Sequence, residues 1–301
     1  MDLKIKVLDF IIFYIYKIFK FFVLIIPTPI IKIFLDALAS FIYLINKEHK
    51  KYAFANLDFV YKDKLSKEEK TSIVKDTYKT LVYNLYEFIQ NQNNTLKDYE
   101  KKITPINDKV LKDAIKQNRK IILITAHYSN WEYGNTWIPL KYKPTTMVGR
   151  PMNNKYFNEE LNKTRTKNNT VMLEKKEAAR GLVKALKSDR IVGLVIDQHN
   201  STGIEVEFLG AKVLQTDSSS KLAIKFDAII VPLFFKRTSF GNYEAIFYDG
   251  IEANDYKGDN QILDLTQAQA IIMQEHIKQN PSQWFWQHKR FKVFNKEIYK
   301  K

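Results

Sequence analysis

The chain has 301 residues, of which 45% are hydrophobic, with no cysteine and a formal net charge of +15. This composition supports a large buried core, and it excludes disulfide bonds and zinc sites built from thiolates. The charge favours a polyanionic partner: a nucleic acid, an anionic membrane surface or a phosphorylated substrate. Neither a P-loop nor a dinucleotide-binding fingerprint is present, and we expect no cofactor.

Residues 1–46 are strongly apolar and aromatic, and we predict that they form a helical membrane anchor. Charged residues, among them Lys17 and Lys20, interrupt this segment. Its longest uncharged stretch, 21–31, is shorter than the roughly 20 residues that a spanning helix needs. Pro27 predicts a break or kink. Three interpretations stay open: a spanning helix, a helix in the membrane interface, and buried helices of a soluble protein.

Residues 47–301 are predicted to form one domain in which helices and strands alternate. The short apolar runs 120–126 and 191–196 are typical of strands buried on both faces. Further strands are expected at 145–148 and 229–235, with an edge strand at 243–248. Helices are expected at 66–90, 108–117, 131–140, 155–168, 178–187, about 217–226 and 264–279. This order predicts an α/β fold with a mostly parallel sheet flanked by helices.

Polar side chains follow three of the expected strands. His127 comes after 120–126, Arg150 after 145–148, and Asp197 after 191–196. In open α/β sheets, ligands bind beyond the carboxyl ends of the strands. These residues are therefore the first candidates for a functional site.

His127 precedes Glu132 by five residues, which places the two side chains about 140° apart on one helix. A strand that ends at His127, followed by a turn into a helix, would bring the two together. Glu132 would then fix the tautomer of the imidazole, which would accept a hydroxyl proton. A buried structural pair is the competing interpretation. No second histidine lies nearby in the sequence, and we expect no metal site.

The stretch AHYSNWEYG resembles the H-x-x-x-x-D/E motif of the bacterial lipid A biosynthesis acyltransferases, whose pattern is commonly H-F-G-N-W-E. Five more elements of that family follow in order. Arg150 to Asn154 resembles R-P-x-x-N, and Arg165 falls at the spacing of a second arginine. Asp197 and Gln198, with Gly203, resemble an aspartate–glutamine element that is followed by a glycine. Segments 206–210 and 281–292 resemble V-x-F-F-G and P-x-Q-Y-x-W-x-H-R-R-F-K.

This resemblance implies a glycerolipid-acyltransferase-like fold and an inner-membrane enzyme whose active site is on the cytoplasmic face. The acyl donor would be an acyl carrier protein thioester, and the acceptor a hydroxyl of a Kdo-bearing lipid A precursor. His127 would act as the general base, oriented by Glu132. The implied substrate-binding residues are Arg150, Asn153, Arg165, Asp197, Gln198, His288 and Arg290.

Several alternatives remain open at this point. Arg150 and Arg165 are expected to bind an oxyanion or a phosphate, or else to form ordinary ion pairs. Asp197 is a sugar ligand, an arginine partner or a turn cap, and Trp284 is expected to pack in the core. The competing functions are a lysophospholipid, glycerolipid or mannoside acyltransferase, an acyl-CoA-dependent enzyme, and a non-catalytic membrane-interface protein. The basic residues are dispersed and no nucleic-acid module is recognisable, so we expect no nucleic acid partner.

Overall fold

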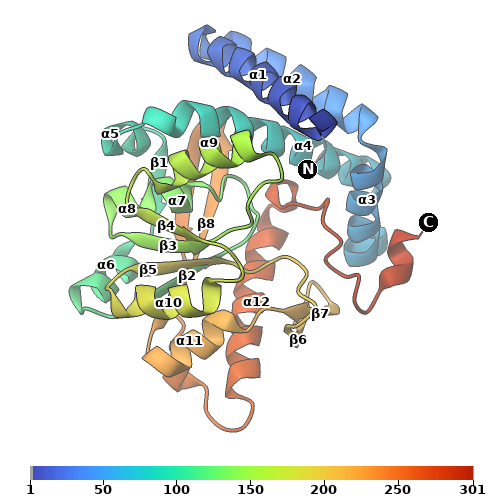
Figure 1. Ribbon diagram of the computed structural model, residues 1–301. Helices are drawn as coiled ribbons and strands as arrows, with labels where there is room; N and C mark the ends of the chain where they lie inside the picture. The colour runs from blue at the N-terminus through green and yellow to red at the C-terminus, as the bar shows by residue number, and fades with distance from the viewer. Residues whose placement is uncertain (1–2, 301) are drawn as a thin grey trace.

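The computed structural model describes residues 3–300 (Figure 1). Its helices are α1 (Leu3–Ile25), α2 (Thr28–Ile45), α3 (Lys47–Tyr61), α4 (Lys67–Gln90), α5 (Leu96–Glu100), α6 (Lys109–Lys116), α7 (Tyr133–Thr136), α8 (Ile138–Lys141), α9 (Lys155–Thr166), α10 (Ala178–Lys187), α11 (Ser218–Phe226) and α12 (Gln261–Gln279). Its strands are β1 (Ile103–Ile106), β2 (Ile121–Thr125), β3 (Thr145–Val148), β4 (Thr170–Leu173), β5 (Ile191–Val195), β6 (Ile204–Phe208), β7 (Ala211–Gln215), β8 (Ile229–Ser239) and β9 (Asn242–Phe247).

Seven strands form one sheet in the order β1-β9-β8-β2-β5-β3-β4. Its pairings are parallel except for β8 with β9, which run antiparallel. Strands β6 and β7 form a separate antiparallel hairpin. The α/β class and the mostly parallel sheet are therefore confirmed.

Helices cover both faces of the sheet, and the central strand β2 shows why its sequence is apolar throughout. Ile122 and Ile124 face a core shared with α10, α11 and α12. Ile121 and Leu123 face the opposite core, which includes α6, α7 and α8. Successive side chains of a strand point to opposite faces, so a strand covered on both sides needs apolar residues at every position.

The N-terminal segment folds into two helices that rest on α4 at one end of the molecule (Figure 1). The chain breaks between Ile25 and Thr28, as Pro27 predicts. The cluster that joins the three helices contains Tyr16, Val23, Ile31, Leu35, Ala39, Val82, Tyr83, Tyr86 and Ile89. The outward faces of α1 and α2 are rich in exposed Ile, Leu and Phe, and Ile33 is 72% exposed. Within residues 3–300, α2 is the helix long and apolar enough to cross a membrane, by length and composition alone.

The structure differs from the sequence predictions in three places. Strand β9 is not an edge strand, because the short β1, which the sequence analysis missed, pairs along its outer side. The helix expected at 131–140 is two short helices, with Trp137 and Pro139 at the join. Strands β4, β6 and β7, which have four or five residues each, were also missed.

Candidate active site

The imidazole of His127 is held by a buried carboxylate, and that carboxylate belongs to Asp197. Nδ1 of His127 lies 2.7 Å from Oδ1 of Asp197, and the backbone N–H of His127 donates to Oδ2 at 2.9 Å. The indole of Trp284 also donates to Oδ2, at 2.8 Å. Burial by itself would raise the pKa of Asp197, but the His127 ring and these hydrogen bonds outweigh it and hold the pKa at about 2. The carboxylate is therefore charged at neutral pH.

Strand register explains why these two residues meet. Strands β2 and β5 are parallel neighbours in which Thr125 is aligned with Val195. His127 and Asp197 each lie two residues beyond that aligned pair. Both therefore leave the same edge of the sheet side by side, at the place where open α/β sheets bind ligands.

The structure corrects the prediction that Glu132 orients His127. The Glu132 carboxylate instead takes two parallel hydrogen bonds from Arg165, from Nε at 2.9 Å and from Nη2. Asn135 donates to it as well, at 2.9 Å. Burial by itself would lower the pKa of Arg165, but Glu132 raises it, so the pair is ionic. Glu132 lies directly before the first residue of α7, and its carboxylate faces Arg165 of α9.

The turn after β2 is held from two sides. The C-terminal segment runs along it: the N–H of Phe285 donates to the His127 carbonyl at 3.1 Å, and the N–H of Ser129 donates to the Gln283 carbonyl at 2.7 Å. From α4, Asn84 donates to the Ser129 carbonyl at 2.7 Å. Ser129 has φ +49°, the left-handed region that favours glycine, which is the residue common at this position of the family motif.

A buried acid lies behind the same turn. Asn130 donates to Oε2 of Glu87 at 2.6 Å, and the Tyr243 hydroxyl donates to the same oxygen. Burial raises the pKa of Glu87. The turn that carries His127 is thus fixed by α4, β9 and the C-terminal segment together.

Gln198 contacts the side of the imidazole that faces away from Asp197. Its Nε2 lies 3.3 Å from Nε2 of His127. The Gln198 carbonyl in turn accepts a hydrogen bond from Arg290 at 2.9 Å. Gln198 is therefore placed to contact any group that approaches Nε2 of the imidazole.

The predicted role of Arg290 in substrate binding is also corrected. Arg290 is 1% exposed, and it binds the protein itself, through the Gln198 and Leu214 carbonyls and the Gln215 side chain. Burial lowers its pKa to about 10, which still leaves it charged at neutral pH. Arg290 thus ties the loop after β5 to β7.

The other predicted substrate residues are scattered around the site. Arg150 and Asn153 are exposed on the loop between β3 and α9. The asparagine at the fifth position of R-P-x-x-N is Asn154, which caps α9 by accepting from the N–H groups of Tyr156 and Phe157. His288 is partly buried with an unpartnered Nδ1, and burial lowers its pKa to about 4.

Sequence reasoning missed Asp197 as the partner of His127 and treated Trp284 only as a packing residue. A signal for Asp197 was present in the sequence, because each of the two apolar runs 120–126 and 191–196 is followed directly by a polar residue, His127 or Asp197. Treating the two runs as neighbouring parallel strands would have predicted that these residues meet. Nothing local in the sequence marks the Trp284 hydrogen bond.

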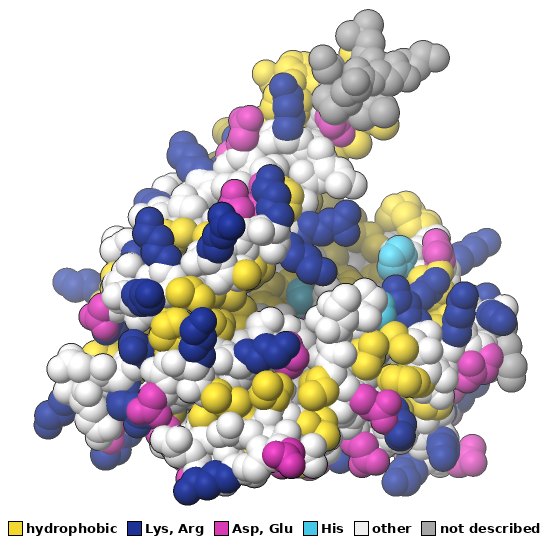
Figure 2. Space-filling view, turned by 60° about the horizontal axis from the view of Figure 1, so that its bottom comes forward, with side chains coloured by type: hydrophobic (Ala, Val, Ile, Leu, Met, Phe, Trp, Pro, Cys, Tyr) yellow, Lys and Arg dark blue, Asp and Glu magenta, His cyan; other side chains and the backbone are white. Residues whose placement is uncertain are grey.

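One face of the molecule is hollowed (Figure 2). Figure 2 shows histidine side chains in and beside the hollow, with lysine and arginine side chains around it. The His127 side chain is 22% exposed, while Asp197 behind it is 3% exposed. A separate cavity of about 420 Å³ lies between α2 and α4, and its lining residues do not include those of the site. Residues 3–300 contain no cluster of three or more His, Asp or Glu side chains that could hold a metal ion.

The chain is similar to a protein family and to solved structures. A search of curated proteins finds no match. Among solved structures, the 1-acyl-sn-glycerophosphate acyltransferase PlsC from Thermotoga maritima is similar, with 11% identity and a TM-score of 0.40 over 83% of this chain and 98% of that chain. The family model described as bacterial lipid A biosynthesis acyltransferase matches residues 1–293. That match spans nearly the whole chain, and this protein belongs to the bacterial lipid A biosynthesis acyltransferase family.

Proposed function

We propose that this acyltransferase moves a fatty acyl chain from an acyl carrier protein thioester to a hydroxyl of a Kdo-bearing lipid A precursor. His127 is the general base and Asp197 orients it. One observation carries this assignment. In a chain of this family, the motif histidine leaves the sheet with Nδ1 on a buried, charged carboxylate 2.7 Å away. Its other nitrogen, Nε2, contacts Gln198 at 3.3 Å, and the acceptor hydroxyl of a substrate would take the place of that contact.

The chemistry follows from that geometry. Asp197 accepts a hydrogen bond from Nδ1–H of His127 and holds the proton on that nitrogen, so the basic lone pair is on Nε2. Nε2 takes the proton of the acceptor hydroxyl as the hydroxyl oxygen attacks the thioester carbonyl carbon. The tetrahedral intermediate then expels the carrier's thiolate, which takes the proton back from Nε2. An ester and a free thiol result, and no covalent acyl-enzyme forms.

Glu132 and Arg165 act as a second unit. The two parallel hydrogen bonds fix the plane of the guanidinium. The contacts of Arg165 to described residues use Nε and Nη2, which leaves Nη1 for substrate. We assign Nη1 to a phosphate or to the oxyanion, both of which need a fixed cationic donor. Exposed Arg150 serves as a further contact for a phosphorylated acceptor.

The net charge of +15 suits this substrate pair. The carrier protein, the phosphorylated lipid and the bilayer surface are all anionic, and a cationic surface speeds encounter with such partners. Basic residues Lys289 and Lys292 lie in the C-terminal segment, which runs along the turn after β2, and there a carrier protein would dock. Nucleic acid is not among the partners we propose.

Helices α1 and α2 form the membrane anchor, and we place it in the interface of one leaflet. The inner face of α2 is packed on α4 through Ile31, Leu35 and Ala39, so a spanning α2 would have to leave that contact. Its outer face carries exposed large apolar side chains. One buried and one lipid-facing side is the pattern of a helix that lies in the interface. The membrane is the inner membrane, with the site on the cytoplasmic face where the soluble carrier is found.

The test is acyl transfer by the purified protein in mixed micelles. We expect transfer from acyl carrier protein to the Kdo-bearing precursor, and a weaker reaction with acyl-CoA or with lysophosphatidic acid. His127→Ala should lower kcat by at least about 10²–10⁴-fold, the usual contribution of general base catalysis. Asp197→Asn should lose a similar factor, since an amide can hold the wrong tautomer.

The matched control is His49→Ala, which removes an exposed histidine of α3 whose ring contacts Asn46. It should leave kcat unchanged. A folded His127→Ala protein that retains its rate would end the proposal that His127 is the base. Preferred use of lysophosphatidic acid would replace the proposed acceptor and leave the dyad intact.

A further inference from the structure

Helix α9, which carries Arg165, is held by the N-terminal arm (helices α1 and α2). Helix α9 contacts α1 on one side and α7 and β4 on the other. In Figure 1 it lies in front of α4, beneath the α1–α2 pair. Thr164 is its one fully buried residue, so the position of α9 depends on contacts at its partly exposed surface. Its partners must therefore fix where it lies.

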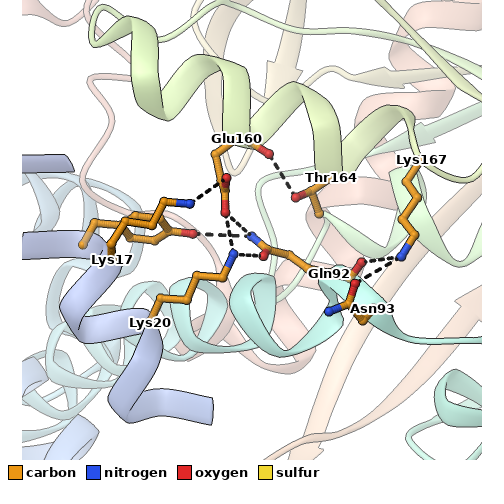
Figure 3. Close-up of polar contacts among 8 residues, drawn as sticks. Lys17, Lys20, Gln92, Asn93, Glu160, Thr164 and Lys167 are labelled. Carbon is orange, nitrogen blue, oxygen red and sulfur yellow. Dashed lines mark hydrogen bonds and ion pairs between the residues drawn. The ribbon is translucent and has the colours of Figure 1, made fainter. Parts of the chain in front are cut away.

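A polar clamp joins α1 to α9 (Figure 3). The Glu160 carboxylate forms ion pairs with two lysines of α1. Nζ of Lys17 lies 3.2 Å from Oε2, and Nζ of Lys20 lies 2.5 Å from Oε1. Gln92, just after α4, donates to Glu160 at 3.3 Å and accepts from Lys20. Burial alone would raise the pKa of Glu160, but the two lysines lower it. Glu160 is therefore ionised and faces two cations of the arm.

Aromatic and backbone contacts strengthen the same junction. The rings of Phe13 and Tyr156 stack with centroids 5.4 Å apart, and Tyr16 meets Phe157 at 4.8 Å. The side chain of Asn154, at the start of α9, donates to the Asp9 carbonyl of α1 at 3.0 Å. The first half of α9 thus lies against α1.

The second half of α9 carries the site residue. Arg165 is five positions after Glu160 and forms the paired hydrogen bonds to Glu132. The hydroxyl of Thr164 donates to the Glu160 carbonyl at 3.0 Å, within the same helix. Lys167, just beyond α9, donates to the Gln92 carbonyl at 2.9 Å. A movement of Glu160 relative to α1 therefore moves Arg165 relative to Glu132.

We propose that Glu160 is a positioning residue through which the Lys17 and Lys20 clamp of the N-terminal arm sets the place of Arg165 in the active site. The arm is then part of the catalytic apparatus and not only an attachment to the membrane. This inference rests on the proposed function, because it takes the Arg165–Glu132 pair to act on the substrate. A misplacement of about 1 Å at a catalytic group can cost up to about 100-fold in rate.

The test compares Glu160→Gln with Glu159→Gln in the full-length protein, by kcat and KM for carrier-bound acyl donor, thermal unfolding and sedimentation with vesicles. Glu159 is exposed on the same helix and has the same charge, so it is the matched control. We expect Glu160→Gln to lower kcat by about 10- to 100-fold. KM should stay within about twofold and vesicle binding should be unchanged, because the outer faces of α1 and α2 are untouched.

Reversing the charges adds a rescue. Glu160→Lys should have a lower kcat than Glu160→Gln. The triple variant that adds Lys17→Glu and Lys20→Glu should have a kcat at least about tenfold higher than Glu160→Lys alone. If Glu160→Gln does not fold, the double variant Lys17→Gln with Lys20→Gln removes the clamp from the α1 side and decides instead. A folded clamp variant with kcat within twofold of the parent overturns the inference, as does a charge-reversed protein that folds without recovery. In either case an inactive His127→Ala protein shows that the proposed function still stands.

Discussion

At the scale of single residues, the Asp197 carboxylate links His127, the proposed general base, to the C-terminal segment. It accepts from the ring and backbone of His127 and from the indole of Trp284. With a pKa of about 2, it contributes stability that is fully present above about pH 4, the range of an unperturbed aspartate. That contribution is lost as the pH falls toward 2, where the folded carboxylate takes up its proton.

Two neighbouring tryptophans separate orientation from packing. Both are buried, and the indole of Trp284 donates to Asp197 while that of Trp286 donates to the Pro281 carbonyl at 2.7 Å. We expect Trp284→Phe to lower kcat by about tenfold, the loss of one hydrogen bond to a charged group of roughly 1.5 kcal/mol. Trp286→Phe should reduce thermal stability with little change in kcat. Equal kcat values for the two variants, each measured as folded protein, would contradict the role of Trp284.

His276 gives the protein a sensitivity to acid that is independent of catalysis. It is 1% exposed, its Nδ1 meets the Tyr248 hydroxyl at 2.9 Å, and its ring stacks on Phe234. Burial, with a smaller effect of Lys236, lowers its pKa to about 3. Between pH 6.5 and 3 the unfolded chain binds a proton at this residue and the folded chain does not. Unfolding therefore becomes more favourable as the pH falls through that range.

Because of His276, we expect the free energy of unfolding to fall by about 1.4 kcal/mol for each pH unit below about 6.5. In His276→Gln that part of the loss should be absent, although the variant is less stable at neutral pH. Denaturant unfolding at pH 7 and pH 5 measures the difference. His49→Gln, at an exposed histidine, is the control and should keep the parent slope. A His276→Gln protein with that same slope would show that another group governs the acid sensitivity.

At the scale of elements, α9 begins with a residue that has two roles. Asn154 caps the helix by accepting from the N–H groups of Tyr156 and Phe157, and it also donates to the Asp9 carbonyl of α1. Serine retains the capping oxygen but not the amide donor, whereas alanine has neither. The two substitutions therefore distinguish the cap from the link to α1.

We expect Asn154→Ala to reduce the free energy of unfolding by about 1 kcal/mol, because the helix loses its cap. Asn154→Ser should lose much less stability, because serine retains a capping oxygen. Both should lower kcat modestly, because both remove the bond to α1. Chemical denaturation and initial rates measure the two effects. Equal stability losses for alanine and serine would mean that the cap contributes little.

At the scale of the whole molecule, the apolar outer surface of the arm is separate from the catalytic body. Ile33 and Phe41 of α2 are 72% and 57% exposed, while Ile271 on α12 is 46% exposed in the body. Single exposed apolar residues are normal, but many on one pair of adjacent helices indicate an interaction with lipid. The net charge of +15 adds an attraction to anionic headgroups.

We expect Ile33→Asn and Phe41→Asn each to weaken vesicle binding by about tenfold, the factor that corresponds to about 1.4 kcal/mol of lost apolar burial. Ile271→Asn, the matched control, should bind vesicles as the parent does. Binding to vesicles with anionic lipid should also weaken as salt is added. Loss of binding in all three variants, or in none, would contradict an anchor confined to the arm.

The sequence by itself determined most of the architecture. Apolar runs located β2 and β5, and the strands expected at 145–148, 229–235 and 243–248 correspond to β3, β8 and β9. The helix expected at 66–90 corresponds to α4. Such patterns depend on neighbouring residues, so the sequence can reveal them. It also determined which sheet edge carries His127 and Asp197, since that edge follows from where each strand ends. The order of the motifs was sufficient to identify the family.

Only the tertiary structure decided which acid meets the imidazole. Glu132 is five residues from His127 and Asp197 is seventy residues away, yet the lateral pairing of β2 with β5 selects Asp197. It also buried Arg290 among backbone carbonyls and placed β1 outside β9. Such contacts join segments far apart in the chain. Strand order, register and the packing of the arm on α4 create them, and no local periodicity or spacing encodes those relations.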